Sequence, residues 1–131
     1  MILIPDDLRP RLLANGSVSD ADHVPLVKLF DPAGPAAWLI SEIQPYDHDV
    51  VFGLTHYGSG KPVIGAFNLA ELQALARSFG FDLERDPLFE GRYPLSVYAE
   101  AARVQGAITT IPSLLDAAAA RLAASRNGGA S

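Results

Sequence analysis

Two groups of histidine and aspartate residues contain the side-chain types that bind transition metals. Residues 47–49 (Asp-His-Asp) precede a β-type segment that ends in His56, and residues 20–23 (Asp-Ala-Asp-His) lie in a polar stretch. Along an extended strand, His48 and His56 would be about 26 Å apart at 3.3 Å per residue. Because Asp favours turns for local hydrogen-bonding reasons, both groups are interpreted as solvated turns. We therefore expect no metal and no other cofactor.

The segment from Gly58 to Lys61 resembles the C-terminal part of a phosphate-binding loop. The match fails because Thr55 stands where the motif needs its first glycine and Pro62 where a Ser or Thr should follow the lysine. A helix should also start at that lysine, whereas residues 63–67 alternate as a strand does. The segment is therefore predicted to be a hairpin loop. No serine lies in a Gly-x-Ser-x-Gly elbow, and without cysteine there is no thiol nucleophile.

Two charged residues lie within β-type runs and are candidates for a site. Lys28 falls in the run 24–30, and Glu42 shares strand parity with Trp38 in the run 36–43. If residues 31–35 join the runs as a hairpin, Lys28 and Glu42 lie on one face, directly or diagonally opposite. Two interpretations stay open. One is a half-exposed ion pair worth about 1 kcal/mol or less, and the other is a polar spot that orients a ligand or partner.

Carboxylates near strand ends offer a further possibility. Glu42, Glu84 and Asp86 would supply acid–base groups if the fold brought them together. Such carboxylates are more often solvated or ion-paired, so hydrolytic chemistry is the less favoured interpretation.

The apolar periodicity predicts helices and strands in a definite order. Strand-like runs cover residues 24–30, 36–43, 50–56, 63–67 and 81–85, and helical patterns cover residues 8–15, 68–79, 96–105 and 111–122. Asn68 and Ser96 are the predicted N-caps. The second helix should pack on the sheet through Leu69, Leu72, Leu75, Ala76 and Phe79. The result is an α+β domain: an antiparallel meander of about four to five strands, a short N-terminal helix, and two to three helices after the strands, packed mainly on one face.

Composition limits the classes of function. The 131 residues include 15 acidic and 10 basic side chains, for a net charge of -5. A protein that binds DNA or RNA directly needs a basic surface, so no direct nucleic-acid partner is expected. No apolar run approaches the ~20 residues of a membrane span, and the N-terminus lacks a cationic leader. We expect a protein of the cytoplasm without a membrane partner.

Several of these segments, in order, resemble a known bacterial family. The residues that carry the resemblance are 25–30, Trp38, Glu42, 52–53, 67–72, 83–86 and Phe89. The sequence is similar to the family called domain of unknown function 2958 over roughly residues 8–98. The resemblance implies an accessory protein of plasmids or integrative elements, with no established activity or cofactor. It also implies that any site should be sought first among the family's polar and aromatic signature positions, which are Lys28, Trp38, Glu42, Glu84, Arg85 and Asp86.

These observations favour a non-enzymatic module that binds an unknown protein partner. One alternative is a small ligand-binding domain or enzyme with a polar site around Trp38, Glu42, Arg85 and Asp86. A further alternative is a counter-defence protein that acts through an acidic face formed by residues 19–60. We expect one α+β domain over residues 1–106, followed over 107–131 by an Ala-rich helix and a disordered tail. The narrow apolar stripe of that helix is predicted to pack on a partner or to form a homodimer.

Overall fold

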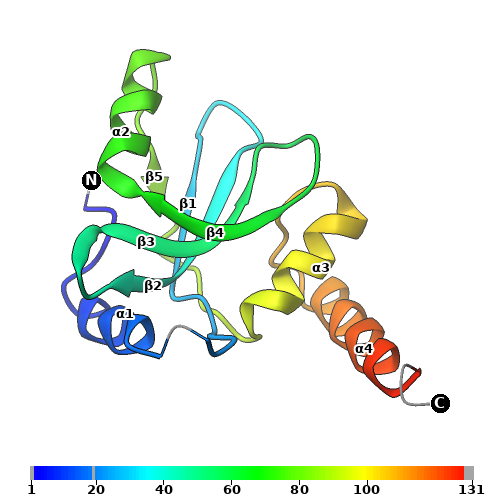
Figure 1. Ribbon diagram of the computed structural model, residues 1–131. Helices are drawn as coiled ribbons and strands as arrows, with labels where there is room; N and C mark the ends of the chain where they lie inside the picture. The colour runs from blue at the N-terminus through cyan, green and yellow to red at the C-terminus, as the bar shows by residue number, and fades with distance from the viewer. Residues whose placement is uncertain (1, 19, 129–131) are drawn as a thin grey trace.

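The computed structural model describes residues 2–18 and 20–128. Its helices are α1 (Arg9–Gly16), α2 (Leu69–Ser78), α3 (Leu95–Gln105) and α4 (Pro112–Gly128). Its strands are β1 (Val27–Phe30), β2 (Ala37–Gln44), β3 (Asp47–His56), β4 (Val63–Asn68) and β5 (Glu84–Arg85). Figure 1 shows the strands at the centre, α2 rising at one end and α3 and α4 on the opposite side. The predicted α+β class is confirmed, with its N-terminal helix and its helices after the strands.

The five strands form one antiparallel sheet in the order β4-β3-β2-β1-β5. Consecutive hairpins join β1 to β4, as the predicted meander requires. Asp31 closes the first hairpin loop, where its carboxylate accepts a hydrogen bond from the backbone N–H of Ala33 at 2.8 Å. The loop between β3 and β4 is the predicted hairpin loop, so the glycine-rich segment does not lead into a helix. There the ring of buried His56 accepts from Gly58 N–H at 2.9 Å and donates to the Gly60 carbonyl at 3.1 Å.

The core lies on both faces of the sheet. One cluster joins α1, α2 and the sheet through Leu12, Val27, Leu29, Trp38, Ile40, Ile43, Val51, Leu69 and Ala76. The other joins α3, α4 and the opposite face through Leu39, Leu54, Leu95, Tyr98, Ala101, Leu115 and Ala118. Every residue of β2, the central strand, is therefore buried. The helices divide more evenly between the faces than the sequence indicates, because β2 is apolar at successive positions from 37 to 40.

Helix α2 has the predicted ends but a different buried stripe. The Asn68 side chain accepts a hydrogen bond from the Glu71 N–H at 3.0 Å, as expected of an N-cap. Gly80 follows the helix with a φ of 91°, the left-handed conformation that glycine adopts without strain. The prediction that Leu75 and Phe79 pack on the sheet is wrong, because these side chains are 54% and 75% exposed. Figure 1 gives the reason: the C-terminal half of α2 extends beyond the sheet.

Helix α3 begins one residue earlier than predicted, and its cap is not Ser96. Pro94 occupies the N-cap position, and Ser96 lies inside the first turn. The carboxylate of Asp22 accepts hydrogen bonds from both the backbone N–H of Ser96, at 3.1 Å, and its hydroxyl. The backbone of His23 also accepts a bond from Leu95 N–H at 2.9 Å. The loop before β1 therefore satisfies donors that a helix start leaves unpaired.

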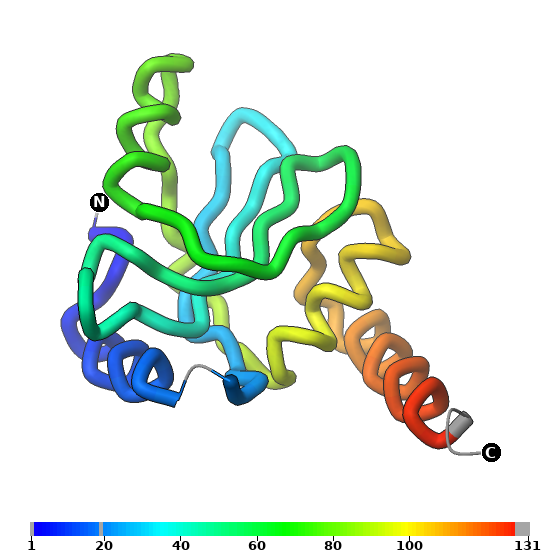
Figure 2. Tube along the Cα trace, viewed as in Figure 1, coloured from blue at the N-terminus to red at the C-terminus, as the bar shows by residue number. Residues whose placement is uncertain are grey.

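Helix α4 packs on α3 and extends away from the sheet, as Figure 2 shows. Leu115 and Ala118 of α4 are buried in the contact. Leu114 and Leu122 are only half-buried, which agrees with the narrow apolar stripe in the sequence. Whether residues 1–106 fold without this helix stays a prediction. In the described part of the chain, no helix combines the length and the apolar character that crossing a bilayer requires.

Candidate functional site

A bulge in β2 determines where Glu42 points. Ile40 pairs with Gly53 and Glu42 pairs with Phe52, so Ser41 is an extra residue in β2. A bulge of this kind reverses the alternation of side chains beyond it. Glu42 consequently shares the α3 face of the sheet with Phe52, whereas Ile40 and Ile43 belong to the core of the opposite face. Gly53 permits the close approach of the strands, because a Cβ there would lie 1.8 Å from the Leu39 carbonyl oxygen.

Glu42 is a buried acid without a hydrogen-bond partner. The residue is 1% exposed, and neither carboxylate oxygen has a partner among the described residues. Burial raises the pKa of Glu42 above its usual value of 4.5, because the charged form loses its hydration. His23 and Gln44 act in the opposite direction and lower this pKa in part. The Gln44 side chain is close, but its geometry falls outside that of a hydrogen bond. A buried acid without a hydrogen-bond partner costs stability, and such residues are frequent at functional sites, so the surroundings of Glu42 are a candidate site.

A hollow of about 240 Å³ lies beside this acid, and we call it the Glu42 pocket. Its lining consists of Asp20, Ala21, Asp22, His23, Ser41, Glu42, Phe52, Ile64 and Leu95. The His23 ring nitrogen Nε2 donates a hydrogen bond to the Val18 carbonyl at 2.7 Å. The Ser41 hydroxyl donates to the Phe52 carbonyl at 3.3 Å. The pocket lining thus combines acidic and imidazole groups with apolar side chains.

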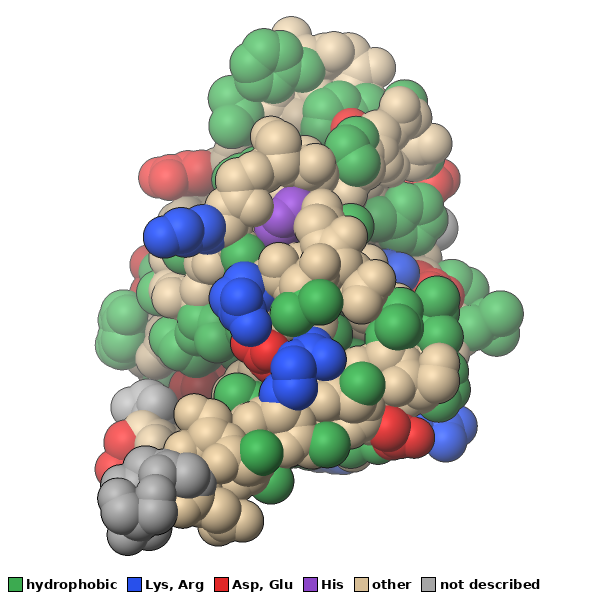
Figure 3. Space-filling model, turned by 90° about the vertical axis from the view of Figure 1, so that its right-hand side faces the viewer, with side chains coloured by type: hydrophobic (Ala, Val, Ile, Leu, Met, Phe, Trp, Pro, Cys, Tyr) green, Lys and Arg blue, Asp and Glu red, His purple; other side chains and the backbone are tan. Residues whose placement is uncertain are grey.

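A wider groove of about 660 Å³ adjoins the pocket, between β4 and the two C-terminal helices. We call it the β4 groove; Lys61, Pro62, Ile64, Ser96, Ala99, Glu100, Arg103 and Leu122 line it. Ile64 lines both hollows, and Leu95 of the pocket is followed in α3 by Ser96 of the groove. Figure 3 shows this side of the molecule, where Lys and Arg side chains gather among hydrophobic ones. We call the two hollows together the depression; its pocket end carries Asp20, Asp22 and Glu42, and its groove end is mainly apolar and carries Lys61 and Arg103 beside Glu100.

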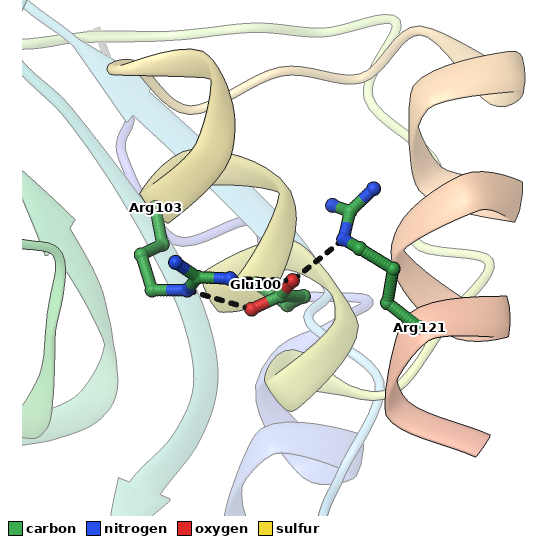
Figure 4. A network of polar contacts seen from close by, with 3 residues as sticks. All are labelled: Glu100, Arg103 and Arg121. Carbon is green, nitrogen blue, oxygen red and sulfur yellow. Dashed lines mark hydrogen bonds and ion pairs between the residues drawn. The ribbon is translucent and has the colours of Figure 1, made fainter. Parts of the chain in front are cut away.

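Glu100 links α3 and α4, the helices that form one wall of the β4 groove. Figure 4 shows its carboxylate between Arg103 of α3 and Arg121 of α4. Arg103 donates to both oxygens, at 2.8 and 2.9 Å, and Arg121 donates to one of them at 2.7 Å. These hydrogen bonds from two guanidinium groups lower the pKa of Glu100 from 4.5 to about 2. The acid is therefore ionised at any physiological pH and holds α4 against α3.

Lys28 and Trp38 do not join Glu42 in one site. Lys28 lies opposite Leu39, so its diagonal neighbours on β2 are Ala37 and Ser41. The predicted direct or diagonal pairing of Lys28 with Glu42 is wrong, because the hairpin register leaves Glu42 three residues beyond Leu39, although both side chains lie on the α3 face. Trp38 is 3% exposed and lies in the core of the other face, where its ring packs edge-on against Tyr57 at 6.0 Å.

The other three signature residues lie at β5, on the far side of β1 from β2. Arg85 pairs with Leu29, and its Nε donates to the Ile2 carbonyl at 3.1 Å. Glu84 pairs with Phe30 and lines a different hollow, beside α2. The Asp86 carboxylate accepts from the backbone N–H of Leu88 at 2.9 Å and closes a turn. The arrangement expected around Trp38, Glu42, Arg85 and Asp86 is therefore not assembled, because Glu42 faces away from Trp38.

The histidines also lie in separate places. His56 organises its hairpin turn, His48 lines a surface hollow near the N-terminus, and His23 lines the Glu42 pocket. Within residues 2–18 and 20–128, no three His, Asp or Glu side chains are placed together to hold a metal ion. The expectation of no bound metal stays a prediction for elemental analysis of the purified protein.

Sequence reasoning assigned residues 20–23 to a solvated turn, but these residues cap α3 and line the pocket. The signal that could have drawn attention to them is Glu42 itself. An acid within a largely apolar central strand is buried, and a buried acid needs polar groups nearby. A polar segment just before the neighbouring strand is the nearest source of them in the sequence.

The fold and the depression together define a small α+β domain whose buried acid lies beneath a pocket that continues into an apolar groove. Comparisons with curated proteins and with solved structures gave no significant match. The chain belongs to the family described as "protein of unknown function (DUF2958)", which matches residues 3–109. The match confirms the resemblance seen in the sequence and includes every strand, α1, α2 and α3, together with all lining residues of the Glu42 pocket.

Proposed function

We propose that this domain is a non-enzymatic binding module that takes up an extended segment of a protein partner along β4. The observation that carries the proposal is the open edge of β4 beside the β4 groove. Within the described chain, β4 pairs on one side only, with β3. A free strand edge presents unpaired backbone donors and acceptors, and an added strand satisfies them.

The side chains of β4 fit this role. Val63 and Ile64 are 59% and 44% exposed, whereas edge strands that avoid partners usually carry charges. Ile64 and Ala66 lie on the α3 face, opposite Leu54 and Phe52. A segment paired with β4 would alternate its side chains, and every second one would reach the groove between Ile64 and Leu122. Backbone pairing supplies affinity in such complexes, and the groove supplies selectivity.

The setting implied by the family agrees with this proposal. An accessory protein of bacterial plasmids or integrative elements in the cytoplasm would act through contacts with other proteins. The net charge of -5 supports a protein partner over direct contact with nucleic acid.

A second candidate is a small-ligand domain or an enzyme that uses Glu42 as a proton donor. The raised pKa of Glu42 in a pocket beside His23 favours it, because general acids are tuned in this way. The counter-defence alternative has less support. Its acidic face would include Glu42, which is buried, and Asp22, which is engaged by Ser96.

A displayed library of random peptides tests the proposal. We expect the library to yield peptides that bind the wild-type protein and that lose at least about tenfold in affinity against Ile64→Asp, because the new charge would be desolvated in the groove. Val63→Asp is the matched control, since it places the same charge on the adjacent residue of β4, on the other face of the sheet. Methylation of alternate backbone nitrogens in a selected peptide should also abolish binding if the peptide pairs with β4. Failure to select any peptide, or equal losses in the two variants, would refute the proposal.

A further inference from the structure

The two unpartnered oxygens of Glu42 indicate what the pocket binds. A buried carboxylate is strongly stabilised by donors that reach both oxygens at once. The guanidinium group presents two parallel N–H donors with the spacing of a carboxylate. It is also more weakly hydrated than an ammonium group, so it enters a buried site at a smaller loss of hydration.

The remaining walls fit the rest of such a side chain. Phe52, Ile64 and Leu95 provide an apolar surface for an aliphatic stem, and an aromatic ring can stack against a guanidinium plane. Asp20 and Asp22 add negative charge at the same pocket, so its electrostatic potential favours a cation. The acid end of the depression thus complements a positive group.

We propose that the Glu42 pocket binds a guanidinium group, and that its natural occupant is an arginine side chain of the partner segment lying along β4. The pocket and the β4 groove share Ile64, so one bound segment can reach both. The identification of the occupant as part of a partner segment rests on the proposed function, whereas guanidinium binding itself does not. Because the Glu42 oxygens are covered in the structure, binding requires the Glu42 side chain to turn toward the pocket.

Small probes test this site without any partner protein. Butylguanidinium carries the cation and a short stem, and butylurea is its neutral counterpart of nearly the same shape. Titrations followed by NMR of the backbone amides should show saturable shifts around Ser41, Phe52 and Leu95 with the cation. Binding of butylguanidinium should be at least about tenfold tighter than that of butylurea, as charge-assisted hydrogen bonds predict.

Two variants with the same change of charge complete the test. Glu42→Gln keeps the size of the side chain and should remove the preference for the cation. Glu84→Gln neutralises an acid of β5 outside the pocket and should leave the preference within about twofold of the wild type. An intact amide spectrum for Glu42→Gln separates loss of binding from loss of fold. Equal binding of the two probes to the wild type, or an unchanged preference in Glu42→Gln, would overturn the proposal.

The outcomes also separate this inference from the proposed function. If butylguanidinium binds through Glu42 but no peptide is selected, guanidinium binding by the pocket is supported and the proposed peptide-binding function is refuted. If peptides bind along β4 without an arginine preference that depends on Glu42, the peptide-binding function is supported and the assignment of a partner arginine as the occupant is refuted, whereas guanidinium binding itself is decided by the two probes.

Discussion

The Glu100 network predicts how the contact between α3 and α4 depends on pH. Glu100→Gln keeps the shape of the side chain and removes the charge that Arg103 and Arg121 bind. At about 1.36 kcal/mol per pKa unit, the fall of the Glu100 pKa from 4.5 to about 2 sets an upper bound of ~3 kcal/mol. The side chains of Arg103 and Arg121 are 61% and 39% exposed, so solvent screening reduces the expected loss to roughly 1–2 kcal/mol.

The sign of the pH dependence follows from the direction of that pKa. Folding lowers the pKa of Glu100, so its stabilisation is fully present above about pH 4.5 and disappears as the pH falls through about 2. Urea unfolding of the wild type and Glu100→Gln should therefore show a gap near neutral pH that closes toward pH 2. The control is Glu90→Gln, because the Glu90 side chain is 83% exposed and lies 3.9 Å from that of Arg92. A gap of constant size down to pH 2, or an equal loss in the control, would show that the network does not act as described.

Three further predictions concern stability. Glu42→Gln should raise the free energy of unfolding by about 1–3 kcal/mol near neutral pH, because it removes an unsatisfied buried charge. Folding raises the pKa of Glu42, so the wild type loses stability as the pH rises above 4.5. The extra stability of Glu42→Gln should therefore vanish below that pH, and extra stability that persists in acid would contradict the prediction. Leu12→Ala should cost about 2–5 kcal/mol in denaturant unfolding and the half-buried Leu72→Ala clearly less, and the reverse order would show that burial in the core does not set the two costs. Truncation after Gly106 should leave a soluble domain that unfolds cooperatively on heating, because α4 packs mainly on α3; insolubility or loss of cooperativity would show that the domain needs α4 in order to fold.

The sequence was most informative where structure is determined locally. Asn68 caps its helix through a bond to a backbone group three residues away, and such bonds can be recognised in the sequence. The four hairpin strands follow from alternation and from the turn residues between them. These features depend on residues within a few positions of one another, so a single sequence is enough to predict them.

The predictions from the sequence are wrong where contacts between distant parts of the chain determine the structure. The position of Glu42 depends on one extra residue in β2, and strand parity cannot reveal a bulge before the partner strand is known. Ser96 has a residue type that favours an N-cap, but the donors at that helix start are satisfied by Asp22 from another part of the chain. Leu75 and Phe79 continue the helical stripe but are exposed, because the C-terminal half of α2 extends beyond the sheet (Figure 1). The Glu42 pocket could not be predicted because it depends on both the bulge in β2 and the contact of residues 20–23 with α3.

The pairing of Asp22 with the start of α3 has a consequence for the order of folding. Asp22 and Ser96 are 74 positions apart, so forming their contact costs a large amount of chain entropy. Interactions between neighbouring residues cannot make this contact form early in folding. We expect the first turn of α3 to be among the last parts of the domain to form and among the first to open. Because the same loop lines the Glu42 pocket, a bound ligand would slow that opening. The rate of amide hydrogen exchange at the start of α3 would then fall when a ligand occupies the Glu42 pocket.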